Sequence, residues 1–330
     1  MKAVVASCWP LVATVGELTG PDPVDLLRIN EAYRLTAAVQ DSVWPGGWGA
    51  IPYPLLLVTP EREFLIGFPR TPPGFAEGRS FAPLGTPILE RPRQLQPNLL
   101  ATFPAFGPPS VIVVGRPDAT GKSSTSWILT VLHEHFHQFQ TADLAYYSAV
   151  EQLDLSGGDQ TGMWMLNYPF PYQSSLVGER FSALSRTLAR LLQQSSASER
   201  RTFWENYVAF LGELSERDRR YLSFQVWQEG VARYVELRTA EVAGRVYDPT
   251  PDFKALPNFQ SFATIGREMR AAIMNELGHP DLAGRQRVSF YAFGAGLALL
   301  LDEDVRDWKG SYRAEKFALE RYVEGRLPSR

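Results

Sequence analysis

The chain of 330 residues is long enough to bury a large core without disulfides or a structural metal, and its 45% hydrophobic and 21% charged residues are ordinary for a globular protein. The 33 Lys and Arg against 36 Asp and Glu leave a net charge of −3, which argues against nucleic acid as a main partner because phosphate binding needs clustered cations. One cysteine, Cys8, excludes an intrachain disulfide and a cysteine-based zinc site.

The first residues permit two interpretations. Val5–Cys8 resembles the cleavage site of a bacterial lipoprotein, with Cys8 as the lipid anchor, although the apolar stretch before it, residues 3–6, is shorter than the usual length of about 7–15 residues. A start further upstream would supply the missing length and place the protein outside the cytoplasm; otherwise a cytoplasmic protein is expected. The alternative is a buried strand within residues 3–12. Near the other end, the 12 apolar residues 290–301 are too few to cross a bilayer, so no transmembrane helix is expected.

The N-terminal part predicts one helix followed by short strands. Asp22–Val43 has Pro23 near its start and apolar residues at helical spacing, and Pro45 follows it. Leu55–Val58 and Glu63–Phe68 are β-rich runs joined by turn residues and predict a hairpin. Further strands are expected at Ile88–Leu89, Leu99–Phe103 and Val111–Val114.

From about Ser123 the pattern becomes helical, and Ser124–Ser126 offers residues that could cap the first of these helices. The fold class is therefore α+β: a β-rich part over residues 1–122 and a helical part over 123–330, which together could form one domain. Helices are expected over 124–148, 176–194, 197–213, 216–243, 262–277 and 286–304.

Three of the four histidines fall within His133–His137, whose sequence HEHFH contains the motif HExxH. Histidines four residues apart lie on one helix face, within roughly 40° of each other, so His133 and His137 can reach one zinc ion. Glu134 lies beside that face, where it can take a proton from a zinc-bound water. His135 points roughly 160–200° away and is not expected to be a ligand.

A catalytic zinc ion takes three protein ligands and a water, so a third ligand is needed. Asp143 follows His137 by six residues, but no glycine turn precedes it, and the helix carries it to the wrong face. Glu151 and His279 are further formal candidates. Glu229 is the better candidate, because it lies in a second long amphipathic helix.

Glu229 stands in the segment WQEGVARY, where the small Gly230 and Ala232 would let this helix approach the HExxH helix closely. The alternative is a surface glutamate paired with Arg233 one turn later. In these residues the chain resembles the gluzincin branch of the zincin metallopeptidases, in which HExxH supplies two zinc ligands and the base, and a glutamate on a later helix supplies the third ligand. The resemblance covers these helices and not the whole chain, and the step of 92 residues from His137 to Glu229 is long for this group.

The resemblance implies a zincin-like α+β fold and a zinc-dependent peptidase. Its Zn²⁺ would be held by His133, His137 and Glu229, with Glu134 as the general base and a peptide or protein as the substrate. Two other functions stay open. A zinc-stabilised binding protein without turnover is one, although a structural site needs no base such as Glu134. A zinc hydrolase of non-peptide amides or esters is the other, since it uses the same activated water.

The resemblance also implies groups around the metal. Tyr291, in the helix over 286–304, would stabilise the oxyanion, with His279 as the other candidate; the alternative for Tyr291 is a core tyrosine. Val111–Val114 would be the edge strand that pairs with an extended substrate. The aromatic segment Met163–Tyr172 could line a substrate groove or act as a lid, or it could be an irregular part of the core.

Overall fold

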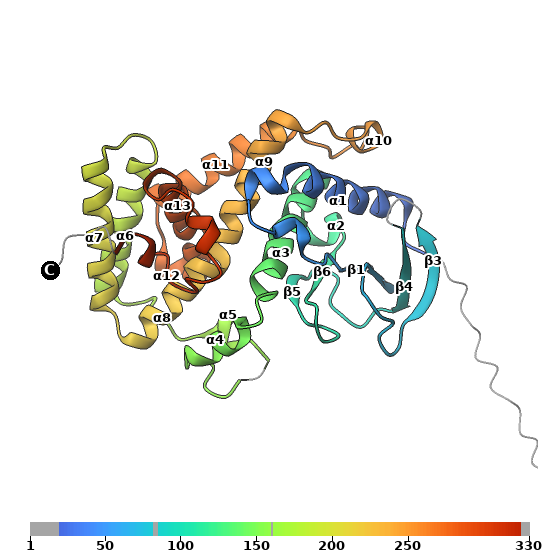
Figure 1. Ribbon diagram of the computed structural model, residues 1–330, viewed down its shortest axis with the longest axis horizontal. Coiled ribbons are helices and arrows are strands. Elements are labelled where there is room, and N and C mark those ends of the chain that lie inside the picture. The colour runs from blue at the N-terminus through green and yellow to red at the C-terminus, as the bar shows by residue number, and fades with distance from the viewer. Residues whose placement is uncertain (1–19, 82–84, 160, 325–330) are drawn as a thin grey trace, which may run out of the picture.

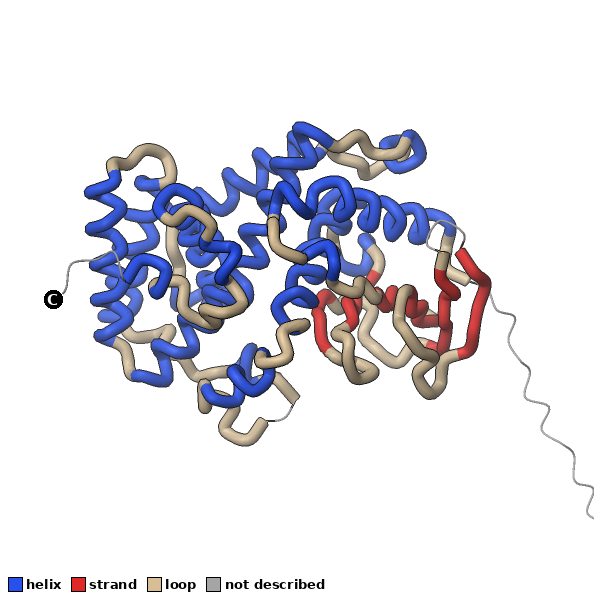
Figure 2. Tube along the Cα trace, viewed as in Figure 1, coloured by secondary structure: helices blue, strands red, loops and turns tan. Residues whose placement is uncertain are grey.

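The structure, a computed structural model, describes residues 20–81, 85–159 and 161–324, so the lipid anchor at Cys8 and the alternative strand within 3–12 lie outside it. One half of the molecule holds a six-stranded sheet, and the other half is built from helices (Figure 1, Figure 2). This arrangement confirms the expected α+β class. Within the described ranges, no helix is long and apolar enough to cross a membrane.

The sheet is mixed and has the strand order β3-β4-β2-β1-β6-β5. Neighbouring strands are antiparallel except β1 and β6, which run parallel. The expected hairpin is present as β1 and β2, with Leu55 opposite Ile66. β3 was not predicted, because its residues lack a period-2 apolar pattern. The strands are β1 (Leu55–Val58), β2 (Arg62–Ile66), β3 (Ala76–Phe81), β4 (Thr86–Pro92), β5 (Leu100–Phe103) and β6 (Val111–Gly115).

β6 lies inside the sheet, between β1 and β5, so the expectation that Val111–Val114 forms the edge strand is wrong. All residues of β6 are buried, as in a strand covered on both faces. β5 takes the edge because it pairs with β6 alone, and its residues are partly exposed. The free edge at this end of the sheet therefore belongs to Leu100–Phe103.

The helices follow the predicted ranges except at their ends and within 216–243, which a π-helical turn interrupts. The helix expected over 124–148 ends at Thr141, where Asp143 accepts a hydrogen bond from the Ala145 amide at 2.9 Å, and a new helix begins at Tyr146. The long helices are α1 (Pro23–Val43), α3 (Ser124–Thr141), α6 (Ser175–Leu191), α7 (Ala197–Glu213), α8 (Glu216–Gln225), α9 (Val231–Val246), α11 (Phe262–Gly278) and α13 (Ser289–Asp304). The short ones are α2 (Pro117–Thr120), α4 (Tyr146–Gln152), α5 (Trp164–Asn167), α10 (Pro251–Lys254), α12 (Leu282–Arg285) and α14 (Arg321–Glu324).

The N-terminus of α3 is capped one residue earlier than expected. Ser123 accepts a hydrogen bond from the Ser126 amide and is the N-cap. The hydroxyls of Ser124 and Thr125 instead donate to the loop at Asn258 and to the backbone beyond it. These bonds tie the start of α3 to the loop that leads into α11.

α3 runs through the middle of the molecule, between the sheet and the other helices (Figure 1). It packs against β5 and β6 on one side and against α9 and α1 on others, and 16 of its 18 residues are buried. One hydrophobic cluster joins residues from both predicted parts, for example Leu35 and Ile112 with Leu132 and Val235. Because a helix buried all round has no water to satisfy its polar groups, the histidines and glutamate of α3 need partners within the protein.

Candidate metal centre

His133, His137 and Glu229 bring three ligand atoms together. The Nε2 atoms of the two histidines, on successive turns of α3, are 3.1 Å apart. Glu229 Oε2 lies 3.8 Å from the Nε2 of His133 and 3.5 Å from that of His137. Among the residues that the structure describes, this is the only group of three or more His, Cys, Asp or Glu side chains that could hold a metal ion.

The spacing of these atoms fits one divalent ion. A tetrahedral zinc with bonds of about 2.0–2.2 Å keeps its ligand atoms about 3.3–3.5 Å apart, and the three separations of 3.1, 3.5 and 3.8 Å bracket that value. Two imidazole nitrogens and a carboxylate oxygen are donors that zinc takes. Two buried nitrogens that point at each other also need a cation or a shared proton between them to be stable.

A π-helical turn, η3 (Val226–Gly230), presents Glu229 to the histidines. It joins α8 to α9 within what the sequence predicts as one regular helix over 216–243. The wider turn shifts the helix phase, and such turns recur at functional sites. Gly230 packs against Gly294 of α13, since a Cβ on Gly230 would lie 2.5 Å from the Gly294 Cα. The expectation that the small Gly230 serves an approach to α3 is therefore wrong.

Gln140 orients the ring of His137. Its Oε1 lies 2.6 Å from His137 Nδ1, closer than the Nε2 of Gln228 at 3.1 Å. Its own Nε2 donates to the carbonyls of Trp227 and Gln228 and to the hydroxyl of Tyr312. Since this fixes Oε1 as the acceptor, Nδ1 carries the hydrogen and Nε2 keeps its lone pair for a metal. Gln140 lies one turn after His137, a spacing that could have identified it in the sequence.

Glu236 stands behind His133. Its Oε2 lies 3.6 Å from His133 Nδ1, too long for a hydrogen bond, so it acts on the ring through its charge. Arg233 forms a 3.0 Å ion pair with Glu236 and not with Glu229, which removes the alternative of a surface Glu229–Arg233 pair. Carboxylates behind a metal-binding histidine orient the ring and raise its basicity. Glu236 follows Glu229 by two helical turns, so the same face carries both.

The charges of these groups shift one another. Burial would lower the pKa of His133, but Glu229 and Glu236 raise it to about 10. Burial also lowers the pKa of His137, but the charge of Glu229 and its hydrogen bond outweigh burial, so this pKa is raised. Burial would raise the pKa of Glu229, yet His137 and His133 hold it well below its usual range. The carboxylates thus favour a positive charge between the two histidines. Either protons on the imidazole rings or a metal ion that competes with these protons can supply that charge.

Glu134 is anchored to the edge of the sheet. The hydroxyl of Thr102 in β5 donates to Glu134 Oε2 at 2.8 Å and lies 3.0 Å from the Glu134 carbonyl oxygen. The Glu134 charge also raises the pKa of both His133 and His137. This carboxylate therefore acts electrostatically on the metal group formed by His133, His137 and Glu229. The sequence carried no local signal for Thr102, because it lies 32 residues before Glu134 and is brought there by the sheet.

Tyr291, the expected oxyanion donor, lies close enough to Glu229 for the charge of that carboxylate to act on it. Burial, followed by the charge of Glu229 and hydrogen bonding to it, raises the pKa of Tyr291 above its ordinary value, so its hydroxyl stays protonated at neutral pH. Arg287 donates from Nη1 to the Tyr291 oxygen at 2.5 Å. A guanidinium only donates, so the Tyr291 oxygen is the acceptor and its hydrogen is left to donate toward the metal group. Arg287 lies one turn before Tyr291, which was the available sequence signal.

His135 is turned away from the metal group, as its helix phase predicted. Its ring stacks on Tyr53 at a centroid distance of 3.8 Å, and its Nδ1 lies 2.8 Å from Gln138 Oε1. Burial lowers the pKa of His135 to about 4, so the ring is neutral at pH 7.

The other candidate ligands do not join the metal group. Asp143 forms a 2.8 Å ion pair with Lys316. Glu151 is exposed at the end of α4. His279 is exposed at the end of α11, with its Nδ1 3.1 Å from the Asn275 carbonyl oxygen. None of the three belongs to the cluster around His133.

The aromatic segment Met163–Tyr172 packs against the helices near Tyr291. The Tyr168 ring stacks on Tyr221 at 4.3 Å, and Phe170 meets Phe290 edge-on at 5.3 Å. Trp164 and Phe170 are buried, whereas Met163 and Leu166 are exposed, and part of the segment lines a hollow of about 410 Å³. The segment is therefore partly core and partly surface, and neither of the two expectations describes all of it.

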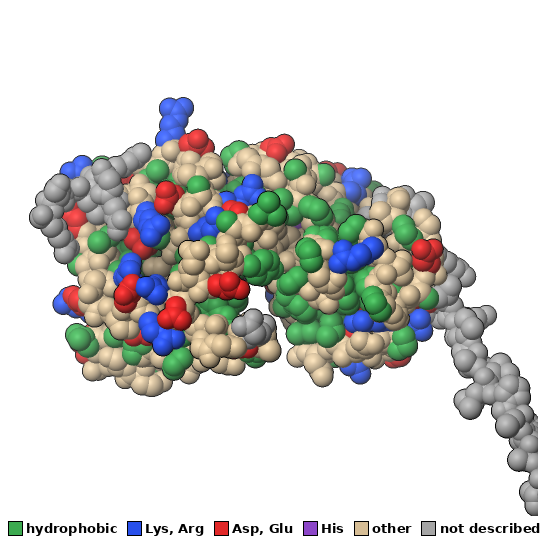
Figure 3. Space-filling view, turned by 60° about the horizontal axis from the view of Figure 1, so that its bottom comes forward, with side chains coloured by type: hydrophobic (Ala, Val, Ile, Leu, Met, Phe, Trp, Pro, Cys, Tyr) green, Lys and Arg blue, Asp and Glu red, His purple; other side chains and the backbone are tan. Residues whose placement is uncertain are grey.

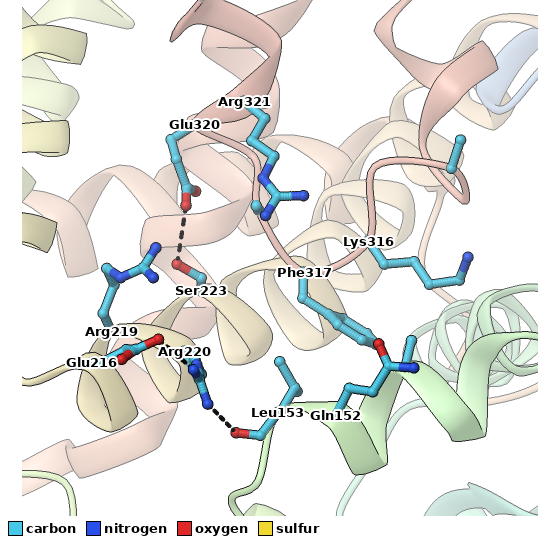
Figure 4. Close-up of a pocket in the computed structure, with 13 residues that line it drawn as sticks. Gln152, Leu153, Glu216, Arg219, Arg220, Ser223, Lys316, Phe317, Glu320 and Arg321 are labelled. Atoms are coloured by element: carbon cyan, nitrogen blue, oxygen red, sulfur yellow. Dashed lines mark hydrogen bonds and ion pairs between the residues drawn. The ribbon is translucent and has the colours of Figure 1, made fainter.

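The metal group lies where the two halves of the molecule meet, because Thr102 reaches it from the sheet and Glu229 from the helices. In the space-filling view an open notch separates these halves (Figure 3). A different hollow, of about 480 Å³, lies between α4, α8 and residues 314–321 and is lined by charged side chains such as Arg219 and Arg321 (Figure 4). No residue of the metal group lines that hollow.

Comparisons of the chain with protein-family models, with curated proteins and with solved structures find no match.

Proposed function

We propose that the protein is a zinc-dependent peptidase with a zincin-like fold of the gluzincin type, in which Zn²⁺ is held by His133, His137 and Glu229. The observation that supports this most is the convergence of these three ligand atoms in the field of the Glu134 carboxylate. A purely structural zinc site would take a fourth protein ligand and would need no base.

The residues around this site match the needs of amide hydrolysis. Bound zinc would lower the pKa of a coordinated water toward about 7 and polarise the scissile carbonyl. Glu134, held by Thr102, accepts the proton of the attacking water and passes it to the leaving amine. Tyr291, whose oxygen accepts from Arg287, would turn its hydrogen from Glu229 to the oxyanion. The edge strand β5 leads to Glu134 and offers unpaired backbone groups to an extended peptide.

Metal analysis tests the ligand set. Purified wild-type protein dialysed against zinc should hold one zinc ion per chain, and Glu229→Ala should lose most of it. Asp143→Ala is the matched control. This carboxylate lies just after the C-terminal end of α3 but pairs with Lys316, so zinc content should not change. Zinc retained by Glu229→Ala, or lost by Asp143→Ala, would contradict the ligand assignment.

Glu134→Gln tests the chemistry. The amide keeps the shape of the side chain and its contact with Thr102 but cannot accept a proton. Cleavage of a broad peptide library, followed by mass spectrometry, should fall by about 10²- to 10⁴-fold while zinc content stays at the wild-type level. Undiminished cleavage by Glu134→Gln would exclude this mechanism. Zinc binding without cleavage by the wild type would instead favour the binding protein that keeps the site without turnover.

A further inference from the structure

Arg287 is a cation beside the metal group that has no ion-pair partner among the described residues. Its guanidinium donates to the Tyr291 hydroxyl, and in the described ranges no carboxylate oxygen lies within 4.0 Å of it. The charge of Glu229 and the hydroxyls of Tyr291 and Tyr221 nevertheless act on it, which places it inside the electrostatic field of the site.

Several other half-buried arginines form ion pairs. Arg233 holds Glu236 at 3.0 Å, Arg238 holds Glu241 at 2.8 Å, and Arg200 holds Asp304 at 2.6 Å. A guanidinium has five N–H donors, and removing them from water costs free energy unless acceptors replace it. Arg287 is half-buried and, among the residues that the structure describes, bonds one protein acceptor only, so its remaining donors are available to a ligand.

The reach of Arg287 can be bounded from Tyr291. Nη1 lies 2.5 Å from the Tyr291 oxygen, and a hydroxyl that donates to an oxyanion lies about 2.7 Å from it. The guanidinium is therefore at most about 5 Å from the oxygen of the scissile carbonyl. An extended peptide advances about 3.3–3.6 Å per residue, so a group of this reach meets the residue next to the scissile bond.

The backbone that holds Arg287 is strained. Gln286 has φ 48° and ψ −130°, a region that residues with a side chain rarely adopt. Arg285 on the other side forms a 2.9 Å ion pair with Glu276 and fixes the preceding turn. Strain of this kind persists where the surrounding structure enforces it, and it often accompanies a functional position.

We propose that Arg287 binds a carboxylate of the substrate next to the scissile bond, so that the protein prefers peptides with a free C-terminal carboxylate or an acidic side chain at that position. This inference rests on the proposed hydrolase function. Glu229, whose charge acts on Arg287, is directed at the metal group and forms no ion pair with Arg287. A carboxylate matches the fork of a guanidinium in shape and charge.

Binding to the zinc-loaded Glu134→Gln protein tests this separately from turnover. The probes are dansyl-Ala-Ala-Ala with a free carboxylate, the same peptide as a C-terminal amide, and two amide peptides that differ by one Asp-to-Asn exchange. The free acid, or the Asp peptide, should bind about 10- to 100-fold more tightly than its neutral counterpart, the value expected for a charged hydrogen-bonded pair. A preference within the acid and amide pair identifies a C-terminal carboxylate as the ligand, and a preference within the Asp and Asn pair identifies an acidic side chain.

Adding Arg287→Gln should abolish this preference, and Arg287→Lys should restore only part of it, because an ammonium lacks the planar fork. Arg270→Gln, which removes an arginine paired with Glu241 on another face, should leave the preference intact. Zinc content and melting temperature confirm that each variant is folded. Equal binding of acid and amide, or a preference that survives Arg287→Gln, would overturn the proposal. A preference that depends on Arg287 in a protein that cleaves no peptide would contradict the peptidase function alone.

Discussion

Gly230 and Gly294 meet backbone to backbone: a Cβ on Gly230 would lie 2.5 Å from the Gly294 Cα, and a Cβ on Gly294 would lie 2.7 Å from the Gly230 Cα. Gly230 directly follows the metal-group residue Glu229, and Gly294 lies one turn after Tyr291. The same helix contact therefore sets the position of a candidate ligand and of the candidate oxyanion donor. Only glycine permits so close an approach.

Gly230→Ala or Gly294→Ala should therefore weaken both the fold and the site. Each added methyl group meets backbone, which cannot rotate away, so we expect a loss of about 1–3 kcal/mol in the free energy of unfolding. Zinc affinity should fall as well, because η3 moves away from α3. Urea unfolding and zinc titration measure the two effects.

Gly178→Ala in α6 is the matched control, since a Cβ there has no neighbour within 4 Å. This exchange should stabilise the protein by about 0.4–1 kcal/mol and leave zinc affinity unchanged. If Gly230→Ala behaved like Gly178→Ala, the close contact with α13 would not constrain the site.

Glu236→Gln should reduce zinc affinity without removing a ligand. The carboxylate faces Nδ1 of His133 and adds to the basicity of that ring, so we expect affinity to fall by about 10- to 100-fold. Competition with a zinc chelator measures the change. Glu241→Gln, on the same helix and also ion-paired with arginine, should have no effect on affinity. Equal effects of the two exchanges would mean that Glu236 acts only through general stability.

The local patterns of the sequence were sufficient for much of the fold. Helical spacing predicted α1 within one residue at its start, and alternating turn and β-rich runs predicted the β1–β2 hairpin. The site residues His133, Glu134 and His137 followed from one helix, since spacing along a helix fixes which side chains share a face. These features depend on neighbours within about four residues, which a single sequence displays.

The remaining features depend on contacts between distant segments. The place of β6 inside the sheet follows from β5 pairing outside it, and no pattern within Val111–Val114 indicates that. The π-turn at Glu229 and the contact of Gly230 with α13 require two helices to be placed in space. Thr102 reaches Glu134 only because the sheet edge lies against α3.

Thr102→Val should slow hydrolysis and leave zinc binding unchanged. Valine keeps the shape of threonine but cannot hold the Glu134 carboxylate, so this base loses one hydrogen bond and becomes more mobile. We expect kcat to fall by about tenfold, the loss of roughly 1.4 kcal/mol of positioning. Thr102→Ser, which keeps the hydroxyl, should retain most of the activity. A fall in zinc content with Thr102→Val would show that the residue supports the ligands and not the base.

His135 should make the protein sensitive to mild acid. Its pKa is lowered by burial to about 4, below the unfolded value of 6.5, so the folded state favours the neutral ring. The stability that this provides is fully present above pH 6.5 and is lost as the pH falls toward 4, by about 3 kcal/mol in all. Chelator-treated wild type and His135→Phe, whose ring can stack on Tyr53 without titrating, are compared by urea unfolding at pH 7, 5.5 and 4. The wild type should lose about 3 kcal/mol more than the variant over this range. Parallel curves for wild type and His135→Phe would show that His135 titrates normally in the folded protein.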